Sequence, residues 1–279
     1  MKYLYVSTDA TTSTSSRAGV HGLDAAAARR AFDILFALTE SDLRARYGRG
    51  PWQLLKWLVD PFALVGIYLL LLTFILRRPG EAPGLSLACA VIPFQLVMMT
   101  IVNGMGAVQL RGSIIRNMAF DRVLIPISST LTEAVAFGAS LVLLVMMMFI
   151  YRVQPTLALL WLPLVLLITL VFAAACAYVA SLIGVWIPDV RPFVVSLMRA
   201  MFFLAPGLVA IGDIGGRAEQ LVKVNPLTGL FESYRSLMLR GESPHAWELV
   251  VPLAWAILLL LVALPLYVRE QHQFAKVLE

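Results

Sequence analysis

Six long apolar runs constrain the fold of this chain more than any other feature of its sequence. Each is long enough for a helix that crosses about 30 Å of hydrocarbon, the first only with help from the residues just ahead of it. The chain is 60% hydrophobic and 14% charged, more apolar than a soluble domain can bury. We therefore expect an all-α integral membrane protein with six transmembrane helices, which excludes a soluble enzyme, a disordered chain and a disulfide scaffold. The runs are roughly Pro61–Leu76, Leu85–Val108, Ile127–Ile150, Thr156–Ile183, Phe193–Ile211 and Leu249–Val268.

The first 28 residues differ from the rest of the chain. They are rich in Ser, Thr and Ala, and no apolar core follows Lys2, so they lack the order of a secretory signal. We expect residues 1–28 to be a disordered cytoplasmic tail. Residues 57–279, which hold the six runs, are expected to form one membrane domain.

Between the tail and the first run, residues 29–56 show a helical pattern. Phe32 and Phe36 fall on one helical face, and Glu40 and Arg44 have the i,i+4 spacing of an ion pair. The apolar stripe is too short and too interrupted to span a bilayer. It predicts an amphipathic helix that lies in the membrane interface, and a soluble helix of a cytoplasmic domain is the alternative.

The distribution of Lys and Arg predicts the orientation. With the N-terminus inside, the cytoplasmic segments carry 14 of these residues and the outer segments carry 7, while Arg199 lies within a run. This asymmetry and the even number of spans place both termini in the cytoplasm and residues 212–247 outside. We therefore expect a multi-pass protein of the plasma membrane. The net charge of +5 is interpreted as a sign of topology rather than of a nucleic-acid partner.

The loop between the fifth and sixth runs carries helix signals. Asn225 can cap a helix, Pro226 suits its first position, and Gly241 suits its exit. A shorter helical piece, about Arg217–Lys223, precedes it. Two amphipathic helices at this place predict a re-entrant or interfacial helical hairpin on the outer side, between spans five and six.

The sequence shows no catalytic constellation. The three histidines lie outside the runs, the two cysteines are far apart, and no Gly-x-x-x-x-Gly-Lys-Ser/Thr motif occurs. We expect no catalytic residue, no metal ligand and no cofactor in this chain, so any ATP hydrolysis must belong to a separate subunit. Ionisable residues within the runs are few, chiefly Glu133 and Arg199, which weighs against an ion-coupled carrier. A structural role and a place along a polar pathway both remain open for these two residues.

Several short motifs, in their order and spacing, give the chain a family resemblance. Over about residues 30–279 it resembles the type-2 ABC transporter permeases, and among them the exporters of O-antigen, teichoic acid, capsule and galactan. Drug and antibiotic exporters share this fold, so they are the alternative to glycan exporters. The motifs are Asp42-Leu-Arg-Ala-Arg-Tyr47, Trp52-x4-Trp57-x2-Asp60-Pro61, the basic stretch Gln109–Pro126, Asp189-Val-Arg191 and Asn225-Pro226-Leu227.

The resemblance implies partners and roles. It implies a homodimer of permeases bound to two copies of an ABC ATPase that holds ATP and magnesium, and a lipid-linked glycan as substrate. The residues implied in ATPase coupling are Glu40, Arg44, Arg111, Arg116, Asp121 and Arg122. Those implied in lining the substrate channel are Tyr68, Phe74, Phe94, Phe202 and Phe203, for which helix packing is the alternative. Those implied in an outer gate are Asn225, Pro226, Phe231 and Tyr234, and a static brace is the alternative there.

Three functions follow as hypotheses. The first is the permease subunit of an ATP-driven exporter of lipid-linked polysaccharide. The second is an exporter of drugs or lipids with the same mechanism. The third is a membrane-integral enzyme of lipid or glycan assembly, which would need a polar catalytic cluster at membrane depth that the sequence does not show.

Overall fold

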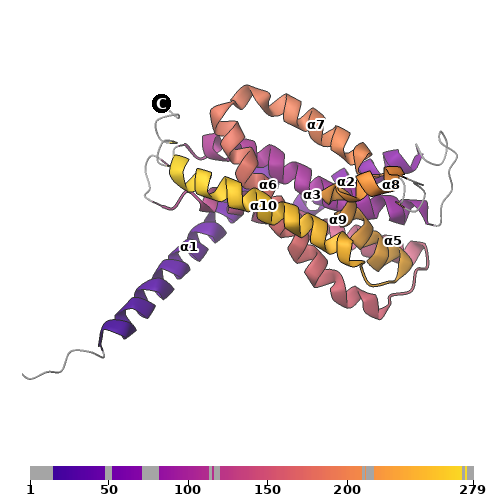
Figure 1. Ribbon diagram of the computed structural model, residues 1–279, viewed down its shortest axis with the longest axis horizontal. Coiled ribbons are helices and arrows are strands. Elements are labelled where there is room, and N and C mark those ends of the chain that lie inside the picture. Colours follow the sequence, from indigo (N-terminus) through magenta and orange to yellow (C-terminus); the bar gives the residue numbers. More distant parts are fainter. Residues whose placement is uncertain are drawn as a thin grey trace, which may run out of the picture.

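The computed structural model describes residues 15–47, 52–70, 82–112, 115, 120–208, 211, 217–271 and 274. Every regular element in this part of the chain is a helix, which confirms the all-α class. Most helices run along the long axis of the molecule, and α1 projects away from them (Figure 1). In chain order they are α1 (Ser15–Tyr47), α2 (Trp52–Leu70), α3 (Pro83–Leu110), α5 (Leu124–Ile150), η2 (Leu157–Trp161), α6 (Leu162–Trp186), η3 (Pro188–Val190), α7 (Arg191–Leu204), α8 (Arg217–Lys223), α9 (Pro226–Arg235), η5 (Ser236–Arg240) and α10 (Ala246–Glu270).

Four helical segments in the described residues are long and apolar enough to cross a membrane. They are α3, α5, the continuous segment η2–α6, and α10. These segments correspond to the second, third, fourth and sixth apolar runs, so four of the six predicted spans are present by length and composition. α2 holds the first part of the first run, whose last residues, 71–76, lie outside the described residues. The count of six spans stays a prediction.

The fifth run does not form one continuous helix. α7 has 14 residues and extends about 21 Å, less than the thickness of the hydrocarbon layer. The chain leaves the helix at Ala205, with φ −97° and ψ 56°, because Pro206 has no N–H and disfavours a helical residue before it. The Gly207 N–H instead bonds back to the Phe202 carbonyl oxygen at 3.1 Å. The prediction of a single helix over Phe193–Ile211 is therefore wrong.

The N-terminal helix is longer than the sequence pattern predicts. α1 begins at Ser15, so residues 15–28 are helical, whereas the sequence predicts a disordered tail there; residues 1–14 lie outside the described residues. α1 packs chiefly against α5 and buries Leu38. Phe32 and Phe36 stay 68% and 64% exposed. Two exposed phenylalanines suit a helix at a membrane interface, and this location stays a prediction.

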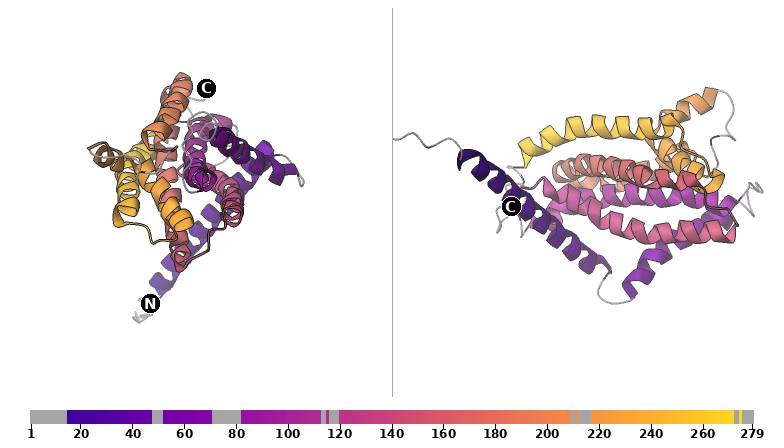
Figure 2. Two further views of the ribbon diagram at one scale, coloured as in Figure 1. Left: turned by 90° about the vertical axis from the view of Figure 1, so that its right-hand side faces the viewer. Right: turned by 90° about the horizontal axis from the view of Figure 1, so that it is seen from below.

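The centre of the bundle is α3. The right-hand view of Figure 2 shows α10, α6, α3 and α5 in that order across the bundle. α3 and α6 approach each other closely at Gly184, which lies against the backbone of Met105. A Cβ added at Gly184 would lie 2.0 Å from the Met105 carbonyl oxygen. At the same crossing the Gln109 side-chain amide donates to the Gly184 carbonyl oxygen at 2.6 Å. The two helices therefore meet backbone to backbone, as membrane helices do where a small residue stands between them.

Candidate functional site

The helix predicted for the loop between the fifth and sixth runs is present, and it lies inside the bundle. α9 begins after Asn225, whose side-chain oxygen accepts a hydrogen bond from the Leu227 N–H at 3.0 Å. The π-helix η5 extends it, and Gly241 ends it with φ 68°, a left-handed conformation that favours glycine. All residues from Leu227 to Arg235 are buried, mainly against α10, α3 and α6. The polar side of this amphipathic helix therefore faces protein and not water.

An ion-paired network centred on Arg235 satisfies that polar side. The side chains of Glu232 and Arg235 are both fully buried, and Nη1 of Arg235 lies 2.8 Å from Oε1 of Glu232. The guanidinium also donates to the carbonyl oxygens of Ser86 (3.2 Å), Pro206 (3.2 Å) and Gly207 (3.0 Å). One side chain therefore connects α9 with the start of α3 and with the turn that follows α7.

Glu232 has two further donors. The backbone N–H of Ile211 donates to its Oε1 at 3.1 Å, and Nη1 of Arg240 lies 3.0 Å from its Oε2. Burial alone raises the pKa of Glu232, but the attraction of Arg235 and the hydrogen bonds from Arg235, Ile211 and Arg240 outweigh it, so this pKa lies below its ordinary value. The carboxylate is therefore ionised at neutral pH and holds both arginines.

The sequence prediction missed this network. Its members Glu232, Arg235, Arg240 and Glu248 are absent from the predicted gate residues, and Ser236 joins them by donating to Oε2 of Glu248 at 2.9 Å. The available signal was the i,i+3 spacing of Glu232 and Arg235, typical of a helical ion pair. Because the sequence predicts a helix at the membrane interface, the charges of Glu232 and Arg235 are expected on the side of the helix that faces water.

Three of the five predicted channel aromatics gather around a fourth, Phe202. Its ring stacks on Tyr68, with centroids 5.6 Å apart, and lies 4.8 Å from the ring of Phe94 and 5.6 Å from that of Phe203. Phe231 of α9, one of the predicted gate residues, joins at 5.8 Å. The cluster therefore brings together side chains of α2, α3, α7 and α9.

This aromatic cluster is packed at its centre and open at one edge. Phe202 and Phe231 are 1% and 0% exposed, whereas Phe203 is 55% exposed. Within a single chain the cluster is a contact between helices. A substrate pathway along it would have to lie on the side of Phe203, whose ring is exposed. The fifth predicted aromatic, Phe74, lies outside the described residues.

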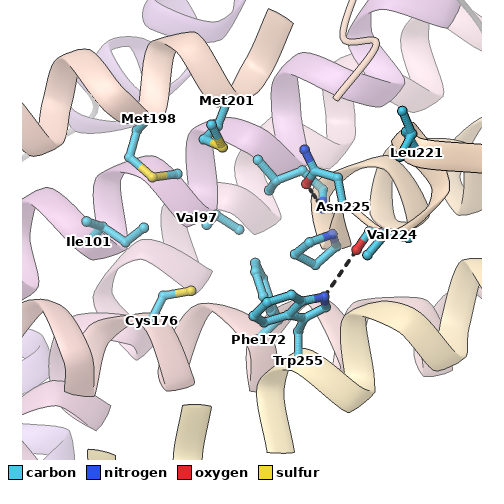
Figure 3. Close-up of a pocket in the computed structure, with 12 residues that line it drawn as sticks. Val97, Ile101, Phe172, Cys176, Met198, Met201, Leu221, Val224, Asn225 and Trp255 are labelled. Atoms are coloured by element: carbon cyan, nitrogen blue, oxygen red, sulfur yellow. Dashed lines mark hydrogen bonds between the residues drawn. The ribbon is translucent and has the colours of Figure 1, made fainter. Parts of the chain in front are cut away.

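A cavity of about 400 Å³ separates α7 from α6 and α10 (Figure 3). Almost all of its lining is apolar. The predicted gate residues Asn225 and Pro226 lie at its edge, near Trp255, whose indole N–H donates to the Val224 carbonyl oxygen at 3.1 Å. The fourth predicted gate residue, Tyr234, lies elsewhere, with its hydroxyl 3.2 Å from that of Thr169. The other lining residues are Val97, Ile101, Phe172, Cys176, Met198, Met201, Leu221 and Leu227.

At the other end of α3, one predicted coupling residue is buried. Arg111 is 5% exposed and forms an ion pair with Asp42 of α1. Its guanidinium also donates to the Ser128 hydroxyl of α5 at 3.1 Å, and the Thr132 hydroxyl lies 3.5 Å from the Asp42 carboxylate. These contacts fasten α1 to the ends of α3 and α5, so Arg111 holds α1 in place.

The other predicted coupling residues that the structure describes are more accessible. Glu40 and Arg44 form an exposed ion pair on α1, one helical turn apart. Asp121 is exposed in the turn before α5, and Arg122 donates to a backbone carbonyl at the end of α10. Arg116 lies outside the described residues. The accessible residues thus lie on α1 and on this turn, and their role in coupling stays a prediction.

Replacing Asp42 by alanine is expected to loosen α1. The change leaves the buried guanidinium of Arg111 without its carboxylate, at a cost of about 1–3 kcal/mol. Faster hydrogen exchange of the α1 amides is the measurement. Glu40→Ala is the matched control, because its exposed pair with Arg44 contributes little to stability. Equal exchange rates in the two variants would show that the buried pair does not hold α1.

These helices define the class of the protein: a multi-pass membrane protein built from long apolar helices around α3. The chain is 23% identical, over 248 residues, to an O-antigen export system permease protein RfbA of Klebsiella pneumoniae, a match of 88% of this chain and 95% of the relative. A second such protein of that organism is 24% identical over 88% of this chain and 95% of the relative. One of Myxococcus xanthus is 25% identical over 87% of this chain and 94% of the relative. No family model matches the chain. The relatives confirm the resemblance to type-2 ABC permeases of the polysaccharide-exporter branch.

Proposed function

We propose that this chain is the membrane subunit of an ATP-driven exporter that moves a lipid-linked polysaccharide from the cytoplasm across the plasma membrane. The observation that carries the proposal is the similarity to O-antigen export permeases over 88% of this chain and 95% of the relative. A match of that extent relates the two proteins almost end to end, and not through one shared segment. A dimer of a separate ABC ATPase would supply the energy, and the glycan would be of the O-antigen, teichoic acid or galactan type.

The aromatic cluster around Phe202 is the proposed wall of the substrate pathway. The C–H-rich faces of sugars suit the negative faces of aromatic rings, so a glycan can slide along such rings without a tight hold. The exposed ring of Phe203 lies on α7, and α2 supplies Tyr68 to the same cluster. We propose that two copies of the chain enclose the pathway between these helices. Helix packing alone is the alternative role.

The network around Arg235 shapes the proposed outer gate. Moving α9 by itself would keep the pair of Arg235 and Glu232, which are both on this helix, but it would break the hydrogen bonds from Arg235 to Ser86, Pro206 and Gly207, at about 1.5–3 kcal/mol each. We propose that α9 moves together with the turn after α7, to which Arg235 is bound. A static brace is the alternative. A cross-link from the exposed residue Glu242, which follows η5, to the second copy distinguishes them, because a brace would leave export unchanged.

The proposed coupling surface is α1 with the turn before α5. Its accessible charges, Glu40, Arg44 and Asp121, lie where the predicted orientation puts the cytoplasm. The same orientation puts the exposed residue Glu242 outside. A cysteine at Glu242 should react with an impermeant thiol reagent in intact cells, and reaction only after permeabilisation would reverse the orientation.

Depletion of the protein tests the proposed function. Lipid-linked glycan should accumulate inside the cell while surface glycan falls, because synthesis continues without export. Extraction and analysis of the lipid-linked glycans measures the accumulation inside the cell, and re-expression of the wild-type chain is the control. Loss of the polymer itself would indicate a biosynthetic enzyme. If depletion changes neither the internal nor the surface glycan, the remaining hypothesis is an exporter of drugs or lipids.

A further inference from the structure

Arg199 of α7 carries an exposed charge for which the described part of the chain offers no partner. It is accessible, and it makes no ion pair or hydrogen bond with any residue that the structure describes. This sets it apart from Arg111 and Arg235, which are buried in networks of ion pairs and hydrogen bonds. Packing against the residues that the structure describes therefore does not account for Arg199.

The depth of Arg199 follows from its neighbours. Met198 and Met201, on either side of it in sequence, line the cavity together with Val97 and Ile101 of α3 (Figure 3). Val97 and Ile101 lie in the middle third of α3, a candidate membrane span of 28 residues. If α3 crosses the bilayer, Arg199 lies near its centre.

Hydrocarbon is an unsuitable environment for Arg199. A charged side chain near the centre of a bilayer is strongly disfavoured when it meets lipid. The side chain is also too short to reach an interface about 15 Å away. Its exposed face must therefore meet water, a charged ligand or another protein surface.

The exposed residues of α7 distinguish the face that carries Arg199 from a face suited to lipid. Ser196, Arg199 and Phe203 follow one another at helical spacing and are all exposed. A second exposed face carries large apolar side chains, Leu197 and Leu204, which are 46% and 60% exposed. The third face holds the methionines that line the cavity. Lipid contact suits the apolar face, and the face of Arg199 is polar and aromatic.

We propose that the face defined by Ser196, Arg199 and Phe203 lines the export pathway, and that Arg199 contacts an anionic group, phosphate or carboxylate, of the exported molecule. The inference rests on the proposed function and adds a substrate class to it. Charge complementarity supports an anion, and the phenyl ring of Phe203, one turn from Arg199, can stack on the sugar next to it. A second copy of the chain could instead cover this face, and the experiment includes that outcome.

Cysteine labelling tests the location without relying on export. In a chain whose two cysteines, Cys89 and Cys176, are replaced by alanine, Ser196→Cys should react with impermeant thiol reagents, and Leu197→Cys should not. A sulfonate reagent should react at Ser196→Cys faster than a quaternary ammonium reagent. Adding Arg199→Gln should lower this ratio of rates on the order of tenfold, because a nearby positive charge attracts one reagent and repels the other. Arg269→Gln, which removes an exposed charge at the end of α10, should leave the ratio unchanged.

Export assays then test the ligand. Arg199→Lys should retain export of the cell's own glycan, and Arg199→Gln should reduce it several-fold with the protein still inserted. No reaction at Ser196→Cys would mean that protein or lipid covers this face, and it would overturn the inference while the exporter assignment stood. A charge-dependent reaction combined with normal export by Arg199→Gln would overturn the ligand role. If depletion of the whole chain leaves glycan export unchanged, the proposed function fails instead.

Discussion

Replacing Arg235 by methionine is expected to lower the free energy of unfolding by about 3–5 kcal/mol. Methionine fills part of the volume but leaves the buried carboxylate of Glu232 without its closest cation. It also leaves the carbonyl oxygens of Ser86, Pro206 and Gly207 without this donor, so α9 loses its attachment to α3 and to the turn after α7. Thermal unfolding of the purified protein in detergent, with the yield of folded protein as a second readout, measures the loss.

Two further variants separate the ion pair from general damage at Arg235. Glu232→Gln combined with Arg235→Met removes both charges of the closest pair, so this double variant should be more stable than Arg235→Met alone. Arg269→Met, at an exposed position of α10, should unfold like the wild type. If Arg235→Met proves as stable as Arg269→Met, the network does not stabilise the bundle.

Replacing Gly184 by alanine is expected to push α3 and α6 apart. The new methyl group would lie 2.0 Å from the carbonyl oxygen of Met105, and this atom belongs to a backbone that cannot rotate away as a side chain can. We expect a cost of about 3 kcal/mol, the upper end of the usual range for overpacking. The melting temperature in detergent should fall, and the hydrogen bond from Gln109 to Gly184 should weaken with the displaced crossing.

Gly138 provides the matched control for this substitution. It lies on an exposed face of α5, and a Cβ built there meets nothing within 4 Å. Alanine also has the better helix propensity, so Gly138→Ala should leave the melting temperature unchanged or raise it. Equal destabilisation by the two substitutions would attribute the effect to glycine as such and not to the crossing of α3 and α6.

Local signals in the sequence were sufficient for several elements. The apolar runs predicted α3, α5, α6 and α10 because hydrophobicity and length are properties of a continuous segment. Asn225 and Gly241 predicted the beginning of α9 and the end of η5, since capping acts over a few residues. The break after α7 had a local signal too, in Pro206, but the surrounding apolar residues suggested a continuous span.

The candidate site was predicted in part, and the resemblance to a family contributed most of that part. It pointed to aromatics on the first, second and fifth spans, and the structure brings Tyr68, Phe94, Phe202 and Phe203 together. It also placed Arg111 at the coupling surface, where the structure instead buries it against Asp42. Composition and spacing say which residues are charged, but not which of them the fold encloses.

The sequence by itself determined that this protein is helical, apolar enough for a membrane, and capped where α9 begins and η5 ends. Only the tertiary structure decided that both faces of α9 are buried, that Arg235 reaches Ser86, 149 positions away, and that Arg199 stays exposed on α7. The physical reason is the separation along the chain over which each interaction acts. Helix formation depends on residues within a few turns, whereas the partner of a charge depends on which distant segments the packing of helices brings within about 3 Å.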